Sequence, residues 1–477
     1  MNTALWSSHE ASSATNGQLL GSVCWEAIDV SIDSRTIQAG SLFIALLGPN
    51  HDGHDHVATS LKNGAVAALV HKIPANVSND APLLLVKNTM IGLVSLAKAA
   101  RNRSDARIIA VTGSVGKTST KEMLKLALGT SGSTYVNQKN LNNHLGVPLS
   151  LARLPKKTKF AVFELGMNHA GEIAQLTNLV RPHIALITAV EAVHIAQFQS
   201  TQQIAKAKAE IFQGVEPNGF AVLPRDNKYY HLLYEAAMIA KITNIISFGS
   251  HLDSDAKLLD SKIDSNTTLI SASFGCDTIN YQINIPNLYW INNSLAALLV
   301  ARSVGVDLKV AASSLIEMNP PKGRGNQKIL SWDDGFIKII DETYNANPIS
   351  MHAAITTLGA IKKCHNIRSI VVLGDMLELG KNAPSMHISL VKSIIENQID
   401  LVYTAGSLMR HLHEALPQDQ QKCHANNSKE IALLVIKILK SGDVVMVKGS
   451  SNSVMKTVIK TIEQVALQKI HKIATRT

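Results

Sequence analysis

A glycine-rich turn between a buried strand and a helix constrains the fold of this chain more than any other segment. The apolar run RIIAVT (107–112) predicts a buried strand, and TSTKEMLKLALG (118–129) has the spacing of an amphipathic helix. The turn that joins them, within TGSVGKTST (112–120), puts Lys117 and Thr118 at the start of the helix. Backbone amides and the helix dipole at such a turn attract phosphate groups. We therefore predict an α/β unit that binds a nucleotide, with ATP as the ligand.

The same turn departs from the ordinary phosphate-binding loop at one position. That loop carries a glycine five residues before the glycine of its Gly-Lys pair, and Val111 occupies this position here. Gly113 stands three residues before Gly116 instead. A lysine at the helix start neutralises the β- and γ-phosphates, and the hydroxyl that follows it can ligate magnesium. The residues of this turn predicted to bind the nucleotide are Thr112, Gly113, Ser114, Val115, Gly116, Lys117, Thr118 and Ser119.

The length of the chain and its alternating pattern predict several domains. At roughly 150 residues per domain, 477 residues exceed one hydrophobic core and suggest about three. Apolar runs alternate with helical stretches, as expected of parallel sheets. The Pro- and Gly-rich stretch MNPPKGRGN (318–326) interrupts this pattern and predicts a hinge. Beyond those already named, the predicted strands are 160–166, 183–190, 219–224, 336–341, 369–375, 401–406 and 443–450.

We therefore predict an α/β protein of three domains. Residues 1–105 would form a small N-terminal α/β domain, in which SLFIALLG (41–48) and AVAALV (65–70) are apolar segments between polar turns. Residues 106–320 would form a central P-loop-like ATP-binding domain with a mostly parallel sheet. Residues 321–477 would form a C-terminal Rossmann-like domain.

Charge and hydropathy narrow the range of partners. The chain has 46 basic and 36 acidic residues, but the positive charges are spread along it without a basic run or a nucleic-acid motif. No apolar run reaches the roughly 18 residues that would span a bilayer. The polar start MNTALWSSHEASSATNG lacks the regions of a signal peptide. We therefore expect no membrane span, no nucleic-acid partner and a cytoplasmic location.

The shortened turn resembles that of the Mur ligase and folylpolyglutamate synthetase superfamily, whose members activate a carboxylate with ATP and capture it with an amine. The segment FELGMNHAGEI (163–173) resembles the family's strand end at which a glutamate binds magnesium, and this implies that role for Glu164. Ligands also collect at the carboxyl ends of buried strands in α/β sheets generally, so the glutamate is a site candidate in its own right. Its polar neighbours in the same segment are Asn168, His169 and Glu172.

Two further segments resemble metal-binding parts of the family. ITAVEAVHIAQFQS (187–200) resembles the segment with a histidine that helps hold a second magnesium, which implies His194. QQIAKAKAEIF (202–212) resembles the helix whose lysine is carbamylated to give a carboxylate-like ligand, which implies Lys208 ahead of Lys206. From its residues alone this helix would present a solvated charged face. The implied catalytic residues are Lys117, Glu164, His194 and Lys208, and the implied metal ligands are Thr118, Glu164, His194 and carbamylated Lys208.

Other segments resemble nucleotide contacts. WINNSLAALLVA (290–301) resembles a helix start whose asparagine contacts adenine, here Asn293, although Tyr289 stands where the family usually has a histidine. GRG (323–325) supplies an arginine that matches a family residue beside the nucleotide. The resemblance places the acidic pair of DETYNANP by the ribose. The nucleotide contacts implied here are Asn293, Arg324, Asp341 and Glu342.

The third domain resembles one branch of the family, the branch that adds D-alanyl-D-alanine to a UDP-linked muramoyl tripeptide. IIDETYNANPISMHAAI (339–355) and VVLGDMLELG (371–380) match that branch closely, and IDSRTIQAGSLFIALLGPNHDGHDH (32–56) resembles its uridine-diphosphate domain. NQKNLNNHLGVPLSL (137–151) resembles the loop near the γ-phosphate, while in VKGSSNSVM Ser451 stands where an arginine is common. The implied substrate-binding residues are Ser34, Arg35, Asn142, Asn143, Tyr344, Asn345 and Asn347.

The resemblance implies ATP and magnesium as cofactors, a UDP-N-acetylmuramoyl-tripeptide and D-alanyl-D-alanine as partners, and a monomer. It leaves open whether the third residue of the tripeptide is diaminopimelate or lysine. Three other activities use parts of the same sequence pattern: a ligase of the superfamily with another acceptor, a P-loop motor or nucleic-acid-stimulated ATPase, and a non-catalytic binding protein. Phosphate release with candidate acceptors would distinguish all of them.

Overall fold

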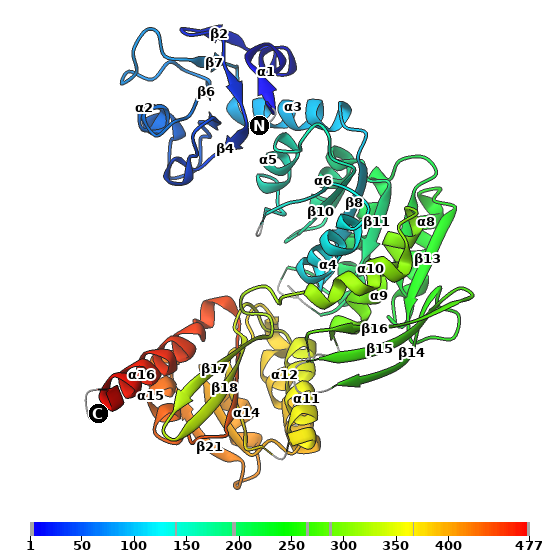
Figure 1. The fold of residues 1–477 in the computed structure, drawn as a ribbon, viewed down its shortest axis with the longest axis vertical. Coiled ribbons are helices and arrows are strands. Elements are labelled where there is room, and N and C mark those ends of the chain that lie inside the picture. Colours follow the sequence, from blue (N-terminus) through cyan, green and yellow to red (C-terminus); the bar gives the residue numbers. More distant parts are fainter. Residues whose placement is uncertain are drawn as a thin grey trace.

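Large β-sheets, each built from a continuous part of the sequence, organise the computed structural model (Figure 1). The structure describes residues 4–138, 141–192, 197–263, 267–285, 289–365 and 367–474, so the predicted metal ligand His194 lies outside the described residues. Most strand pairs are parallel, and helices cover the sheets, which confirms the predicted α/β class. The domain boundaries at residues 105 and 320 remain predictions. Among the described residues, no helix is long and apolar enough to cross a membrane.

The N-terminal sheet has the order β2-β7-β6-β5-β4, with parallel pairing except between β2 and β7. Its buried strands are short and apolar, and a separate ribbon joins β1 to β3. The strands are β1 (Trp6–Ser7), β2 (Gln18–Leu20), β3 (Glu26–Ala27), β4 (Asp29–Ser31), β5 (Ser41–Ile44), β6 (Ala67–Val70) and β7 (Leu83–Leu85). The helices are α1 (Ser8–Thr15), α2 (Val57–Lys62) and α3 (Thr89–Asn102), with 3₁₀ turns η1 (Ser34–Thr36) and η2 (Gly53–His56).

The central sheet has the order β16-β15-β14-β13-β12-β11-β8-β10-β9. The strand that precedes the glycine-rich turn, β8, lies between β10 and β11 and pairs parallel with both. The strands are β8 (Arg107–Thr112), β9 (Thr134–Val136), β10 (Phe160–Glu164), β11 (Ile184–Ile187), β12 (Phe220–Pro224), β13 (Asn244–Gly249), β14 (Ala256–Ile263), β15 (Thr268–Phe274) and β16 (Asp277–Ile283). The helices are α4 (Lys117–Gly129), α5 (Gly146–Ala152), α6 (Glu172–Val180), α7 (Thr201–Ala209), α8 (Tyr230–Ile239), α9 (Tyr289–Ser303) and α10 (Leu308–Ser314), with 3₁₀ turns η3 (Glu210–Gly214) and η4 (Leu315–Glu317).

This arrangement brings the predicted site segments to one edge of the central sheet. Carboxyl ends of neighbouring parallel strands meet at the same edge, so the turn after β8, the end of β10 and the end of β11 lie together. The far side of the sheet differs from the expected parallel pattern, because β14, β15 and β16 form an antiparallel meander. In β15, buried residues alternate with more exposed ones, as is typical of a strand with one face on the core.

The C-terminal sheet has the order β17-β18-β22-β19-β20-β21, parallel except for the β17–β18 hairpin at its edge. The ends of β18 and β22 are neighbours, since Glu342 pairs in register with Lys448. The strands are β17 (Asn326–Trp332), β18 (Gly335–Glu342), β19 (Ser369–Gly374), β20 (Leu401–Ala405), β21 (Gln421–Ala425) and β22 (Val444–Lys448). The helices are α11 (Pro348–His365), α12 (Ala383–Ile388), α13 (Leu390–Glu396), α14 (Met409–Ala415), α15 (Ser428–Ile436) and α16 (Lys456–Ala474), with 3₁₀ turns η5 (Gly380–Asn382) and η6 (Ser451–Ser453).

The two junctions between the sheets differ. At the first, the indole N–H of Trp6 donates to the Ala152 carbonyl at 2.8 Å, and Leu149 joins the apolar core of the N-terminal sheet. The Arg103 guanidinium also lies over the Trp6 ring and donates to the Leu5 carbonyl. At the second, the segment between η4 and β17 has no helix or strand. The first junction is therefore packed, whereas the second is a linker.

Candidate active site

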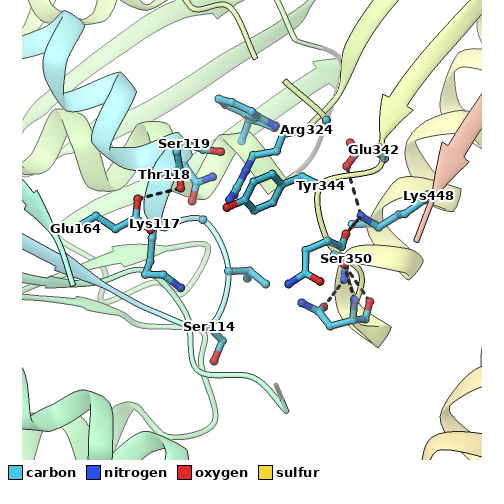
Figure 2. Close-up of a pocket in the computed structure, with 18 of the residues that line it drawn as sticks. Ser114, Lys117, Thr118, Ser119, Glu164, Arg324, Glu342, Tyr344, Ser350 and Lys448 are labelled. Carbon is cyan, nitrogen blue, oxygen red and sulfur yellow. Dashed lines mark hydrogen bonds and ion pairs between the residues drawn. The ribbon is translucent and has the colours of Figure 1, made fainter. Parts of the chain in front are cut away.

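A cleft separates the central sheet from the C-terminal sheet (Figure 2). The turn after β8 and the end of β10 form one wall, and the ends of β18 and β22 with the start of α11 form the other. The central wall consists of Ser114, Val115, Gly116, Lys117, Thr118, Ser119, Asn142, Glu164, Trp290 and Asn293. The C-terminal wall consists of Gly323, Arg324, Glu342, Tyr344, Asn345, Asn347, Ser350, Ala353 and Lys448.

The glycine-rich turn needs its two glycines because its backbone passes close to other side chains. Gly113 has a positive φ of +154°, and a Cβ there would lie 1.9 Å from the hydroxyl of Thr188. Gly116 has φ +86°, and a Cβ there would lie 2.5 Å from Oδ1 of Asn293. A side chain at either position would therefore displace a neighbour and strain the backbone. The result is a tight turn that leads into α4 with Lys117 as its first residue.

Glu164 is held with its carboxylate toward the turn. Its Oε2 accepts a hydrogen bond from the Thr118 hydroxyl at 2.9 Å, and its Oε1 accepts one from the Asn142 amide at 2.8 Å. The side chain is buried at the carboxyl end of β10. Figure 2 shows the carboxylate beside Thr118 at the start of the helix. The arrangement places a hydroxyl oxygen and a carboxylate oxygen side by side next to the phosphate-binding turn.

Two lysines lie on this side of the cleft: Lys117 lines the wall, whereas Lys208 on α7 does not line it but is near enough for the charge of Lys117 to act on it. The ammonium of Lys117 donates to the Gly113 carbonyl at 2.6 Å, and desolvation lowers its pKa while the Glu164 carboxylate acts in the opposite direction. Lys208 on α7 is 3% exposed, and burial together with the nearby charge of Lys117 lowers its pKa well below the ordinary value. Lys206 on the same helix is exposed. The expectation of a solvated lysine face is therefore wrong for Lys208, because α7 packs that side against the core.

The C-terminal wall is built from paired groups. The ammonium of Lys448 lies 3.4 Å from the Glu342 carboxylate and donates to the Asn345 carbonyl at 3.0 Å. The Arg324 guanidinium lies 4.0 Å from the centre of the Tyr344 ring, and Figure 2 shows this stack between the two walls. Burial raises the pKa of Glu342 and lowers that of Lys448, and each charge opposes the other's shift.

Several predicted residues do not reach the cleft. The hydroxyl of Thr112 donates to the Leu165 carbonyl in the interior. Asn143 is exposed and accepts from the N–H groups of Leu145 and Gly146, so it orders the start of α5. Asp341 is buried and accepts from the Thr343 N–H and hydroxyl. The adjacent Glu342 lines the cleft instead, since consecutive strand residues point to opposite faces.

The remaining predicted substrate residues occupy two places. Tyr344, Asn345 and Asn347 line the C-terminal wall, and Asn347 also caps α11 by accepting from the Ser350 N–H at 2.9 Å. Ser34 and Arg35 line a second cleft, between the N-terminal sheet and the central sheet. Arg35 pairs there with Asp33 at 2.9 Å.

Sequence reasoning missed several residues of the cleft. Lys448 is the last residue of β22, and the rule that ligands collect at strand carboxyl ends could have singled it out. Trp290 lies in a segment already noted for its asparagine, but an aromatic residue at a helix start gives no signal of its own. Gly323 lies in the GRG segment that was noted for its arginine. Nothing in the local pattern marks Ser350 or Ala353 as lining residues, because the position of α11 beside the cleft brings them there.

The donor set fits a magnesium ion that is shared with a polyphosphate. Among the described residues, no group of three or more His, Cys, Asp or Glu side chains could hold a metal. Magnesium in nucleotide sites typically takes one or two protein oxygens and completes its shell with phosphates and water. The Thr118 hydroxyl and the Glu164 carboxylate provide such oxygens beside the turn.

Domains of one protein family match successive parts of the chain and together cover most of it. Residues 29–103 match the Mur ligase family catalytic domain, 111–301 the Mur ligase middle domain, and 329–451 the Mur ligase glutamate ligase domain. The UDP-N-acetylmuramoyl-tripeptide–D-alanyl-D-alanine ligase of Rickettsia prowazekii is 33% identical over 446 residues, which cover 94% of this chain and 97% of that protein.

Solved structures give the same result. MurF from Acinetobacter baumannii is 29% identical with a TM-score of 0.83, and the match covers 96% of this chain and 99% of that one. MurF from Thermotoga maritima, solved in complex with ADP, is 25% identical with a TM-score of 0.76 over 92% of this chain and 98% of that one. The similarity therefore extends through all three sheets.

Proposed function

The chain belongs to the Mur ligase family, and from that premise we propose that it is the ATP-dependent ligase that adds D-alanyl-D-alanine to UDP-N-acetylmuramoyl-tripeptide. The product would be the UDP-muramoyl-pentapeptide precursor of peptidoglycan. The observation that carries this proposal is the cleft itself. It joins a phosphate-binding turn to the YNANP segment, and relatives that match nearly the whole chain are named for this reaction.

The reaction must first make the tripeptide carboxylate reactive, because a carboxylate cannot expel oxide. A carboxylate oxygen bonds to the γ-phosphorus of ATP as the bond to the ADP oxygen breaks, which gives an acyl phosphate and ADP. The D-alanyl-D-alanine amine, after losing a proton, then attacks the acyl carbon, and phosphate leaves as the amide forms. The first step joins two anionic groups, and the second develops negative charge on the acyl oxygen, so positioned positive charge is the main requirement.

We assign this positive charge to the central wall. Lys117 would lie against the β- and γ-phosphates, and the backbone amides of residues 113–118 would bind their oxygens. We propose that Thr118 and Glu164 hold magnesium, which when bound would neutralise phosphate charge. His194 is proposed as a further ligand on the sequence resemblance alone. The Asn142 amide would keep the Glu164 carboxylate oriented.

We propose that Lys208 carries a carbamate in the active protein. Addition of its free amine to CO2 forms a nitrogen–carbon bond and releases one proton, and the product is a carboxylate-like group. The burial of Lys208 supports this, since a lowered pKa leaves more of the amine in the free form that reacts. A buried lysine without a carboxylate partner among the described residues is otherwise unfavourable. The carbamate would give α7 an anionic ligand close to Lys117.

We place the dipeptide at the side of the cleft formed by the C-terminal loops. A hollow of about 280 Å³ there is lined by the turn residue Ser114 and by segments that follow β18, β19 and β22. Its other lining residues include Tyr344, Asn345, Asn347, Glu378, Ser450 and Asn452. These loops come from three neighbouring strands, so one acceptor could contact all of them. The position beside the phosphate-binding turn suits an amine that attacks an acyl phosphate.

The remaining assignments follow from the two other parts of the molecule. We propose that the second cleft, lined by Ser34 and Arg35, binds the UDP-sugar end of the tripeptide substrate. Arg35, which is paired with Asp33, supplies guanidinium N–H groups to this cleft, and such groups can bond phosphate oxygens. The nucleotide contacts would be Asn293 and Arg324, with Asp341 shaping the strand end beside Glu342. We also propose the three-domain division at residues 105 and 320, a monomer, and a cytoplasmic location where both nucleotides are available.

The decisive experiment measures phosphate release and product mass with a UDP-muramoyl tripeptide and ATP. D-alanyl-D-alanine, D-alanine, D-glutamate and diaminopimelate are compared as acceptors under one condition. We expect D-alanyl-D-alanine to be the best acceptor, because a site that binds its second carboxylate and its amide loses those contacts with a single amino acid. A free amino acid as the best acceptor would assign the chain to another branch, and phosphate release that depends on DNA or RNA would contradict a ligase.

A further inference from the structure

The fully buried amide Asn137 connects segments that serve the proposed reaction. Asn137 directly follows β9, is 0% exposed and does not line the cleft. Its side-chain oxygen accepts from the Glu164 N–H at 2.9 Å. Its side-chain nitrogen donates to the Leu141 carbonyl at 2.8 Å and to the Glu164 carbonyl at 3.4 Å. Both the oxygen and the nitrogen of the Asn137 side chain therefore form hydrogen bonds.

These bonds fix the end of β10. The paired part of β9 ends at Val136, opposite Val162, so Glu164 has no strand partner on that side. The Asn137 side chain takes the place of the missing strand, since it bonds both the N–H and the carbonyl of Glu164. A buried backbone group without a partner would destabilise the strand end. The backbone from which the Glu164 carboxylate extends is thus held by a side chain.

The same amide fixes the carboxylate's partner. Leu141 immediately precedes Asn142, whose amide donates to Glu164 Oε1 at 2.8 Å and whose carbonyl accepts from the Gly166 N–H at 2.8 Å. A third element joins through Lys121, a buried residue of α4 that donates to the Asn137 carbonyl at 2.7 Å. α4 is the helix that begins with Lys117. Asn137 therefore links the phosphate-binding helix, the Glu164 strand end and the Asn142 loop.

We propose that Asn137 is a positioning residue for ligation, which sets the geometry of Glu164 and Asn142 without touching substrate. The inference rests on the proposed function, because that function puts these two residues to use. The loop has a second face, since Gln138 and Leu141 line the cleft beside the N-terminal sheet. Asn137 thus connects Glu164 to a loop whose residues line both clefts.

The test compares two substitutions in the full-length protein with a matched control. Asn137→Ala removes all three side-chain bonds, whereas Asn137→Asp keeps the shape and the acceptor for the Glu164 N–H but cannot donate to the Leu141 carbonyl. The control is Thr268→Val, which removes the bond from a fully buried hydroxyl to the Ile285 carbonyl in the distant antiparallel meander. Measurements are kcat for ligation, affinity for magnesium-ADP by calorimetry, ADP affinity without magnesium, and amide hydrogen exchange of the peptide that contains Glu164.

Loss of supporting hydrogen bonds around a metal ligand typically reduces activity or metal affinity about 10- to 100-fold. We expect kcat to fall by about this factor in both Asn137 variants, with ADP affinity in the absence of magnesium changed less than about twofold. Exchange at Glu164 should accelerate in Asn137→Ala and stay slow in Asn137→Asp, which retains the acceptor for that N–H. Thr268→Val should match the unmodified protein in kcat.

Three outcomes would overturn the inference: kcat of the Asn137 variants within about twofold of the unmodified protein, an equal loss in Thr268→Val, or loss of metal-free ADP binding, which would show a purely structural role. If Asn137→Ala does not fold, the isosteric Asn137→Asp carries the test. Failure of the proposed function is a separate result, because it would appear as absent dipeptide-dependent phosphate release in the unmodified protein.

Discussion

The two sides of the cleft differ in whether their lysines form ion pairs within the protein. On the central side, Lys117 in the wall and Lys208 near it on α7 form no ion pair with any carboxylate in the described part of the chain, and desolvation lowers both pKa values. On the C-terminal wall, Lys448 is as buried as Lys208 but is paired with Glu342 and bonded to the Asn345 carbonyl. Lys117 and Lys208 therefore have no bonded anion and could gain one from a ligand, although the Glu164 carboxylate lies in the same wall, whereas Lys448 already has its partner within the protein.

This difference indicates what each wall does. An unpaired buried cation is unfavourable unless an anion arrives, so the central wall gains most when a polyphosphate binds. The C-terminal wall is joined to the rest by a linker without helix or strand, and its paired charges stay satisfied wherever that sheet moves. We expect closure of this wall over the turn to exclude water from the acyl phosphate. Lys117 and Lys208 should thus matter for turnover, and the Lys448–Glu342 pair for stability.

The largest effect should come from Lys117→Ala. This change removes the cation closest to the turn, and loss of one such charge-stabilising group typically lowers kcat about 100- to 1000-fold. The fold should persist, because the Lys117 ammonium bonds a single carbonyl of the turn. Initial rates of phosphate release and the thermal midpoint Tm check both points. Turnover near that of the unmodified protein would contradict the assignment of the central wall to ATP.

Lys208→Ala should lower kcat by about 100-fold, because it removes the proposed carbamate ligand. Acetate or formate should restore part of the activity by supplying a carboxylate in the vacated space. The matched control is Lys206→Ala, which changes an exposed lysine two residues away on the same helix and should leave kcat unaltered. Full activity of Lys208→Ala without added acid would refute the carbamate.

The next largest effect should be a difference in stability between a lysine substitution on each side of the cleft. Lys448→Met leaves the buried Glu342 without its partner, and breaking a buried pair typically lowers the free energy of unfolding by about 3 kcal/mol or more. Lys208→Met replaces an unpaired buried amine by an apolar chain of similar length, so it should raise Tm in CO2-free buffer. Chemical unfolding of both variants measures the contrast. Equal losses in the two would show that the walls do not differ in this way.

The stabilisation expected from Lys208→Met should change with pH in a definite direction. The pKa of Lys208 is lower in the folded chain than its ordinary value of 10.5. Between these two pKa values the unfolded chain binds more protons, so the folded state loses stability as the pH falls. The gain from Lys208→Met should therefore be largest at low pH and shrink as the pH approaches 10.5.

The smallest effect should come from Arg324→Ala. Its guanidinium stacks on the half-exposed Tyr344, and such a contact at an exposed site is worth about 0.5 to 1 kcal/mol, so we expect KM for ATP to rise about two- to fivefold. Arg225→Ala is the matched control, because Arg225 lies over Tyr230 at 4.1 Å and does not line the cleft. An equal change of KM in both variants would remove Arg324 from the nucleotide site.

Much of the fold was predictable because its signals are local. The glycine-rich turn, the apolar strands on either side of it and the polar residues that follow strand ends are read from neighbouring residues, and β8, α4 and β10 occupy the predicted places. The antiparallel meander β14 to β16 was missed. Its alternating pattern is a strand signal, but strand direction within a sheet depends on connections and partners rather than on the strand's own residues.

The sequence by itself determined which chemical groups stand at the start of α4 and at the end of β10, because chain neighbours and strand ends place them whatever the rest of the molecule does. Tertiary structure alone decided between residues that look alike in sequence. It buried Lys208 and exposed Lys206, and it turned Glu342 rather than Asp341 to the cleft. It used the Asn143 side chain to bond the backbone at the start of α5, whereas the adjacent Asn142 lines the cleft. It also paired Lys448 with Glu342, about a hundred residues away in the chain. Burial and pairing depend on which distant elements pack together, and a local pattern does not contain that information.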